Sequence, residues 1–267
     1  MQMKTEAPAK EPLSLKETGV ALGGVSRRYR PRRRKEPPVE ALDGVELEVR
    51  AGEVLGVVGP SGCGKSTLLE LVAGLQEPDA GTVTAAGASD ARGRRAACAY
   101  MPQRDLLLPW RSALSNAGLA LECQGVRPAE ARRRAAPLFE RFGLAQFERA
   151  RPADLSGGMR QRVAFLRTLL AGRPILLLDE PFGALDSLTR ASMQSWLAQT
   201  LTGERRTVLL VTHDVEEAVY LADRIVLLSP RPGRVIATFE VGLSRPRERT
   251  SLEVVELRER ALTALGL

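Results

Sequence analysis

Glycine, lysine and hydroxyl side chains follow one another between residues 59 and 67 of the 267-residue chain. The order is Gly59-Pro60-Ser61-Gly62-Cys63-Gly64-Lys65-Ser66-Thr67, which matches the G-x-x-x-x-G-K-[ST] pattern of a phosphate-binding loop. Glycines let backbone N–H groups close around phosphates, the lysine charge reaches the β- and γ-oxygens, and the hydroxyl of Ser66 ligates Mg²⁺. We therefore predict that these residues bind a nucleotide with Mg²⁺, and do not form a simple glycine-rich turn.

A second stretch further along the chain offers another anion site. Its residues are Ser156-Gly157-Gly158-Met159, at the expected start of a helix. A hydroxyl, free backbone N–H groups and the positive end of the helix dipole together favour a phosphate. A chain with two such sites is expected to use the second one on the nucleotide bound by another copy of itself.

Acidic residues and a histidine end two apolar runs. Asp179 and Glu180 follow Ile175–Leu178, and His213 follows Val208–Val211 and Thr212. Carboxylates at the carboxyl edge of a sheet lie where ligands bind. We predict that Asp179 holds Mg²⁺, that Glu180 is the general base and that His213 contacts the γ-phosphate and the attacking water. The alternatives are two acids that cap the turn before Pro181 and a structural histidine.

The elements that must position these residues alternate between strand and helix. This alternation predicts an α/β fold with a mostly parallel sheet, interrupted by a helical insertion over roughly 106–170. Expected strands are Val20–Val25, Val45–Val49, Val54–Val58, Thr82–Ala86, Ala97–Met101, Ile175–Leu178, Val208–Val211 and Ile225–Leu228. Expected helices are Lys65–Leu75, Thr189–Leu201, Val215–Leu221 and an amphipathic helix within 250–266 that packs on the domain or docks a partner.

These motifs stand in the order and spacing of the ATP-binding cassette (ABC) ATPases, which the chain resembles over nearly its whole length. The resemblance implies a P-loop NTPase core with an antiparallel β subdomain and an inserted α-helical subdomain over about 104–170. It implies an ABC ATPase domain at 19–249, between a disordered lead-in at 1–18 and a helical tail at 250–267. It also implies that Gln103 is catalytic and a Mg²⁺ ligand, that Tyr29 stacks on adenine, and that Asp186 lies at the dimer seam. Ser156, Gly157, Gly158 and Met159 would contact the other subunit's ATP.

A narrower resemblance lies in Leu106-Leu107-Leu108-Pro109-Trp110 and in Ser229-Pro230-Arg231-Pro232-Gly233-Arg234. Both stretches are similar to the ATPases of importers for nitrate, aliphatic sulfonates, taurine and the thiamine pyrimidine precursor. The resemblance implies a transmembrane permease as partner, with Trp110 as the anchor of that contact. The alternative is that Leu106–Trp110 belongs to the core of the helical subdomain.

Composition argues against several classes of protein, among them membrane-spanning, disulfide-rich, zinc-binding and nucleic-acid-binding proteins. The apolar runs are far shorter than the ~20 residues that span a bilayer, and Met1–Gly19 is not a signal peptide. The net charge of +7 is accounted for by the seven basic residues between Arg27 and Lys35. We read this segment as a solvated loop, or alternatively as a contact for lipid headgroups or ATP phosphates, and expect no nucleic-acid partner. Three cysteines without metal-ligand spacing predict neither disulfides nor zinc; Cys63 is either a tolerated small residue or a reactive thiol.

The sequence thus predicts an ATP-dependent homodimer that hydrolyses ATP at the cytoplasmic face of the cell membrane. It would drive uptake of a small solute through a permease, with a solute-binding protein as an indirect partner. One alternative is a soluble ABC ATPase that acts on nucleic acid or ribosomes. Another is a nucleotide-dependent regulatory or assembly subunit without transport.

Overall fold

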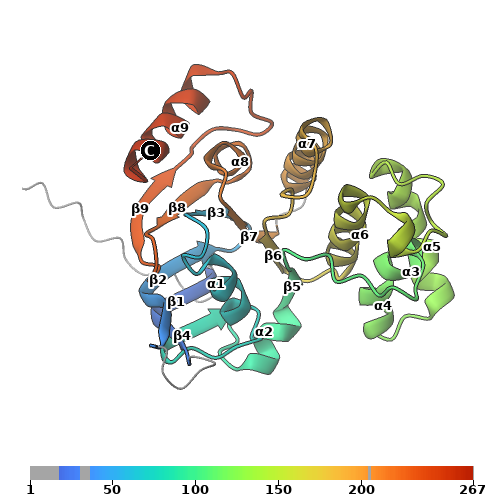
Figure 1. The fold of residues 1–267 in the computed structure, drawn as a ribbon, viewed down its shortest axis with the longest axis horizontal. Coiled ribbons are helices and arrows are strands. Elements are labelled where there is room, and N and C mark those ends of the chain that lie inside the picture. The colour runs from blue at the N-terminus through green and yellow to red at the C-terminus, as the bar shows by residue number, and fades with distance from the viewer. Residues whose placement is uncertain (1–17, 31–36, 204–205, 267) are drawn as a thin grey trace, which may run out of the picture.

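Two β-sheets form the frame of the protein (Figure 1). The computed structural model describes residues 18–30, 37–203 and 206–266. An antiparallel sheet has the strand order β2-β1-β4, and a larger sheet has the order β5-β6-β7-β3-β8-β9. In the larger sheet the strands from β5 to β8 run parallel, and β9 pairs antiparallel with β8. The strands are β1 (Thr18–Tyr29), β2 (Val39–Arg50), β3 (Val54–Val58), β4 (Ala80–Ala85), β5 (Cys98–Met101), β6 (Ile175–Asp179), β7 (Thr207–Thr212), β8 (Arg224–Leu228) and β9 (Val235–Glu240).

The central strands β3, β6 and β7 are buried along their whole length, as expected for parallel strands covered on both faces. Leu55 and Val57 of β3 join one apolar cluster, and Val54 and Val58 join the other. The register pairs Val58 with Thr212 and Asp179 with Val211. The carboxyl ends of the three strands therefore meet at one edge of the sheet.

Helices cover both faces of the parallel sheet. Helix α1 (Lys65–Val72) lies between the two sheets and contacts β2 and β4 as well as β6 and β7. On the other face, α8 (Val215–Leu221) packs against β3 and β7 and carries α9 (Leu252–Ala264) on its outer side. Helix α7 (Ser187–Gly203) follows β6, and α2 (Ala91–Ala97) precedes β5.

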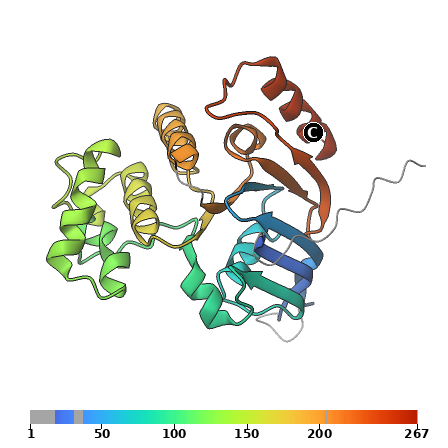
Figure 2. The ribbon, with the colours of Figure 1, turned by 180° about the vertical axis from the view of Figure 1, so that it is seen from behind.

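The remaining helices form a lobe beside the two sheets (Figures 1 and 2). The lobe consists of α3 (Ala113–Ala117), α4 (Leu119–Cys123), α5 (Pro128–Arg141), a 3-10 turn (Pro152–Asp154) and α6 (Gly157–Leu170). Aromatic rings join it to α7, with Trp196 4.4 Å from Phe142 and 6.0 Å from Phe165 between ring centroids. Among the described residues, no helix is long and apolar enough to cross a membrane.

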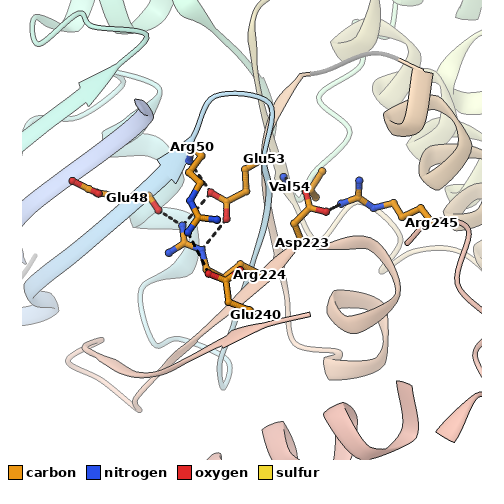
Figure 3. Close-up of polar contacts among 8 residues, drawn as sticks. All are labelled: Glu48, Arg50, Glu53, Val54, Asp223, Arg224, Glu240 and Arg245. Atoms are coloured by element: carbon orange, nitrogen blue, oxygen red, sulfur yellow. Dashed lines mark hydrogen bonds and ion pairs between the residues drawn. The ribbon is translucent and has the colours of Figure 1, made fainter. Parts of the chain in front are cut away.

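A polar cluster fastens the opposite, amino-terminal edge of the sheet (Figure 3). Arg224 at the start of β8 forms an ion pair with the buried Glu53, with Nε and Oε1 2.8 Å apart. Nearby, Asp223 accepts hydrogen bonds from the backbone N–H of Val54 at 2.9 Å and from Arg245 at 2.5 Å. Arg245 thereby attaches the segment that follows β9 to the core (Figure 3).

The predicted fold class is confirmed: an α/β core, an antiparallel sheet and a helical lobe between β5 and β6. Several element bounds were wrong. The first two strands are longer than predicted, α1 ends at Val72 because Gly74 takes a φ of +68°, and Thr18 already belongs to β1. Ala97 belongs to α2, which was not predicted, and neither was β9. The predicted lead-in otherwise lies outside the described residues.

Candidate active site

The phosphate-loop residues wrap the amino end of α1. Gly64 caps this helix with a φ of +107°, and a Cβ atom there would lie 2.6 Å from the carbonyl oxygen of Ala41. Only glycine satisfies both conditions. Lys65 is buried, and its Nζ donates hydrogen bonds to the carbonyl oxygens of Gly59 (2.7 Å) and Pro60 (3.0 Å). The ammonium group is therefore held at the centre of the loop.

A cavity of about 260 Å³ opens beside this loop. The residues that line it lie far apart in the sequence, from Tyr29 to Arg231, and are brought together by the tertiary fold. The residues that line it are Tyr29, Val39, Ala41, Ser61, Gly62, Gly64, Lys65, Ser66, Thr67, Gln103, Glu180 and Arg231. Predicted ATP residues, the predicted base and Gln103 thus share one cavity.

Tyr29 lies at the rim of the cavity, at the end of β1. Its hydroxyl is 3.2 Å from that of Thr67 and donates a 3.1 Å hydrogen bond to Gln76. Arg27 lies over the ring, with its Cζ 5.2 Å from the centroid. The aromatic ring is therefore placed beside the phosphate loop, and its stacking on adenine stays a prediction.

Asp179 and Glu180 differ in environment although they are neighbours. Asp179 is buried at the end of β6, and burial raises the pKa of its carboxyl, while a hydrogen bond from Ser66 lowers it. The Tyr100 hydroxyl donates to Asp179 at 3.4 Å. Two adjacent oxygen donors, Ser66 and Asp179, suit Mg²⁺, which prefers oxygen ligands and needs few protein groups when phosphates complete its shell.

Glu180 begins the turn after β6 in the left-handed region, with a φ of +47°. Its backbone N–H donates to the carbonyl of Val211 on the neighbouring strand, at 2.9 Å. The side chain receives two partners: the amide nitrogen of Gln103 lies 3.0 Å from Oε2, and Nδ1 of His213 lies 3.3 Å from Oε1. Two of the residues predicted to be catalytic, Gln103 and His213, therefore both contact the third, Glu180.

The serine and glycines of the second anion site begin α6. Ser156 is the helix N-cap, and its Oγ accepts the backbone N–H of Met159 at 3.2 Å. Ser156 and Gly157 are exposed, and Gly158 and Met159 are half-buried. Arg160 binds Asp105 and the carbonyl of Leu155. These residues do not contribute to the 260 Å³ cavity of the same chain.

Two further predicted contact residues are at the surface. Asp186 caps the start of α7, where the N–H of Thr189 donates to Oδ1 at 3.0 Å and lowers the pKa of the carboxyl. Trp110 is 69% exposed and Leu106 is 59% exposed, whereas Leu107 between them is buried. The alternative that Leu106–Trp110 is ordinary core is therefore wrong for Leu106 and Trp110 and correct for Leu107.

Comparison with known proteins decides the family. The sequence model described as "ABC transporter" matches residues 42–183, more than half of the chain. The chain belongs to the ABC transporter family. Its structure also resembles a dimeric ATP-binding cassette bound to ADP and phosphate, with a TM-score of 0.74 and 31% identity over 83% of this chain and 98% of that one.

Curated relatives agree with this membership. An aliphatic sulfonates import ATP-binding protein of Cupriavidus necator is 46% identical and covers 90% of this chain and 77% of its own length. A formylaminopyrimidine import ATP-binding protein of Halalkalibacterium halodurans is 44% identical over 86% of this chain and 87% of its own. The protein is thus an ABC ATPase cassette that binds ATP.

The cassette contains site residues that the sequence did not single out for this role. Arg231 reaches the phosphate loop, where its Nε donates to the carbonyl of Gly62 at 2.9 Å. It comes from the Ser229–Arg234 stretch, which was noted as a resemblance only. This stretch can pack closely against the phosphate loop because residue 233 is a glycine: a Cβ there would lie 2.2 Å from the carbonyl oxygen of Cys63.

Cys63 has the plainer of its two predicted roles, whereas the predicted solvated loop is wrong for Arg27 and Arg28, which belong to a strand. Cys63 is buried, and burial raises the pKa of its thiol, which does not favour a reactive thiolate. Arg27 and Arg28 lie in β1 and pair with Asp79 and Glu40 respectively. Residues 31–36 of the basic segment lie outside the described residues.

Proposed function

We propose that the protein is the ATP-hydrolysing subunit of a membrane importer and works as an ATP-dependent dimer. One observation carries this proposal. The cavity with Lys65, Glu180 and Gln103 lacks the exposed amino end of α6, which the same chain presents elsewhere on its surface. A second copy would supply Ser156–Gly158 to the γ-phosphate, and its Asp186 would lie at the seam between the copies.

The chemistry follows from the contacts of Glu180. Its carboxylate takes a proton from the attacking water, whose oxygen bonds to the γ-phosphorus as the bond to the ADP oxygen breaks. Gln103 and His213, both in contact with Glu180, orient the carboxylate and the water. Lys65 and the loop N–H groups bind the phosphate oxygens. Ser66 and Asp179, together with Gln103, would hold Mg²⁺, which would neutralise charge on the phosphates.

Loss of the γ-phosphate removes the contacts that would hold two copies together. The helical lobe carries both the α6 end and the exposed Trp110, so closing and opening of the dimer would move the surface around Trp110. We propose that this surface docks a transmembrane permease at the cytoplasmic face of the cell membrane. The cargo, delivered by a solute-binding protein, would be a sulfonate or a pyrimidine precursor, by analogy with the relatives; taurine and nitrate are further candidates.

The test is a co-purification of the tagged Glu180→Gln variant in mild detergent, with ATP present throughout. The variant keeps the shape of the side chain but cannot accept the proton, so it should trap the ATP-bound dimer. A polytopic membrane protein recovered in equal amount supports the importer. The same preparation with ADP is the control and should release the dimer. Recovery of only soluble protein or nucleic acid would overturn the transport assignment, and a monomer with ATP would overturn the dimer scheme.

A further inference from the structure

A buried carboxyl group lies behind the catalytic contacts and has no part in the mechanism above. Glu217 of α8 is 4% exposed, and its Oε2 accepts a 3.0 Å hydrogen bond from Nε2 of Gln194 in α7. Its Oε1 is buried and has no hydrogen-bond partner among the described residues. Glu217 also lines a cavity of about 40 Å³, together with Glu180 and His213.

The turn that carries His213 is hydrogen-bonded to the first turn of α8, which contains Glu217. The Oγ1 of Thr212 accepts the N–H of Asp214 at 3.0 Å, and Oδ1 of Asp214 accepts the N–H groups of Glu216 and Glu217. Thr212, His213 and Asp214 all line the small cavity that Glu217 also borders. Asp214, the residue that follows His213, is therefore held by the start of α8.

Burial makes this position costly for a charged carboxylate. Burial raises the pKa of Glu217 to about 7, and the charge of Asp214 adds to the rise, while Arg190 lowers it. Arg190 of α7 lines the same small cavity. A buried carboxyl beside Glu180 and His213 is a candidate for positioning these two side chains.

Gln194, which donates to Glu217, also binds the segment that follows β9. The Oε1 of Gln194 accepts a 2.5 Å hydrogen bond from Arg249, whose Nη1 binds Glu216 at 3.1 Å and whose guanidinium lies 4.0 Å above the ring of Tyr220. Arg247, two residues earlier, donates to the last carbonyl groups of α8. A continuous chain of contacts thus runs from Arg249 through Gln194 to Glu217.

We propose that Glu217 is a positioning residue that holds the His213 turn against Glu180, and that Arg249 keeps Glu217 in place through Gln194. This inference rests on the proposed roles of Glu180 and His213 in ATP hydrolysis. It goes beyond them because it couples the C-terminal segment to the rate of the chemical step. Binding of ATP involves the other side of the site, so affinity for the nucleotide should not change.

The experiment is steady-state ATP hydrolysis by the full chain, with kcat and KM measured for Glu217→Ala, Glu217→Gln and Arg249→Ala. We expect Glu217→Ala to lower kcat about tenfold, since a misplacement of ~1 Å costs up to about a hundredfold. KM should stay within about twofold. Glu217→Gln, which keeps an acceptor and the shape, should recover most of the loss, and Arg249→Ala should lower kcat by a smaller factor. The exposed Glu253→Ala in α9 is the control and should behave as wild type.

A double variant separates positioning from general damage. In a His213→Ala background, Glu217→Ala should cause no further loss, because the residue acts through His213. The same fold-loss in both backgrounds, a raised KM at constant kcat, or a wild-type kcat for Glu217→Ala would overturn the inference. If Glu217→Ala does not fold, Arg249→Ala decides, and a wild-type kcat overturns the coupling. Hydrolysis that survives in Glu180→Gln would instead refute the proposed function on which the inference rests.

Discussion

The side-chain amide of Gln103 donates a 3.0 Å hydrogen bond to the carboxylate of Glu180. Gln103 follows β5, where the chain leaves the sheet for the helical lobe, and Glu180 follows β6, where it has returned. The bond therefore joins the entry of the lobe to the residue that we propose as general base. A movement of the lobe would therefore shift the carboxylate of Glu180 through this hydrogen bond.

Gln103→Ala should lower kcat for ATP hydrolysis about tenfold or more, because Glu180 loses one of its two orienting partners. The affinity for ATP should change little, since Lys65 and the loop remain. Steady-state hydrolysis together with a nucleotide titration measures both quantities. Arg104→Ala, at the exposed neighbouring position, is the matched control. An equal loss in both variants would contradict a specific role for Gln103.

Lys65→Ala should weaken ATP binding by about ten- to a hundredfold, because charge-assisted hydrogen bonds to the phosphates are lost. Fluorescence titration with a labelled nucleotide gives the Kd. The exposed Arg92→Ala, which also removes one positive charge, should bind as wild type. Unchanged binding in Lys65→Ala would place the phosphates elsewhere.

Trp110→Ala should leave ATP hydrolysis by the isolated protein unchanged and weaken binding to the permease by at least about thirtyfold, the loss typical of an aromatic interface anchor. Pull-down from detergent extracts measures the second effect. Trp110→Phe should retain part of the binding. Leu75→Ala, exposed on the other part of the molecule, controls for a general loss of surface hydrophobicity. Full complex formation by Trp110→Ala would exclude the docking role.

Phe165→Ala should lower the free energy of unfolding by about 3–5 kcal/mol, because the ring is fully buried and its loss leaves a cavity. The ring contacts Phe142, Phe182 and Trp196, so the variant should separate the helical lobe from α7. Urea denaturation followed by circular dichroism measures the change. Leu252→Ala, at a position that is 76% exposed, should stay within about 0.5 kcal/mol of wild type.

Glu217→Gln should remove a pH dependence of stability. Burial raises the pKa of Glu217 from 4.5 to about 7 in the folded protein. The folded state therefore binds a proton more tightly than the unfolded state, so the wild type loses stability as the pH rises from 4.5 to 7. Relative to wild type, the variant should gain up to about 3 kcal/mol over this range. Denaturation at pH 5 and pH 8 measures it, and a constant difference between the two proteins would contradict the shifted pKa.

The motifs alone predicted the fold class and the candidate site, for a local reason. A phosphate loop is a strand, a tight turn and a helix end in one continuous stretch, so residues 59–67 suffice to identify it. The buried runs before Asp179 and His213 predicted their strands, and parallel strands place their carboxyl ends at one edge. The contacts of Glu180 with Gln103 and His213 agree with that expectation.

Only the tertiary structure decided which distant residues complete the site. Arg231 reaches Gly62 because the loop between β8 and β9 packs against the phosphate loop, and no local pattern encodes that approach. The same holds for the contacts of Arg249 with Gln194 and of Gln194 with Glu217, which join the segment before α9 to α7 and α8. Periodicity also missed β9, whose residues alternate between half-buried and exposed. A motif that binds phosphate can be recognised in a short segment of sequence. Residues that meet only through tertiary packing cannot, because their positions depend on the fold of the whole chain.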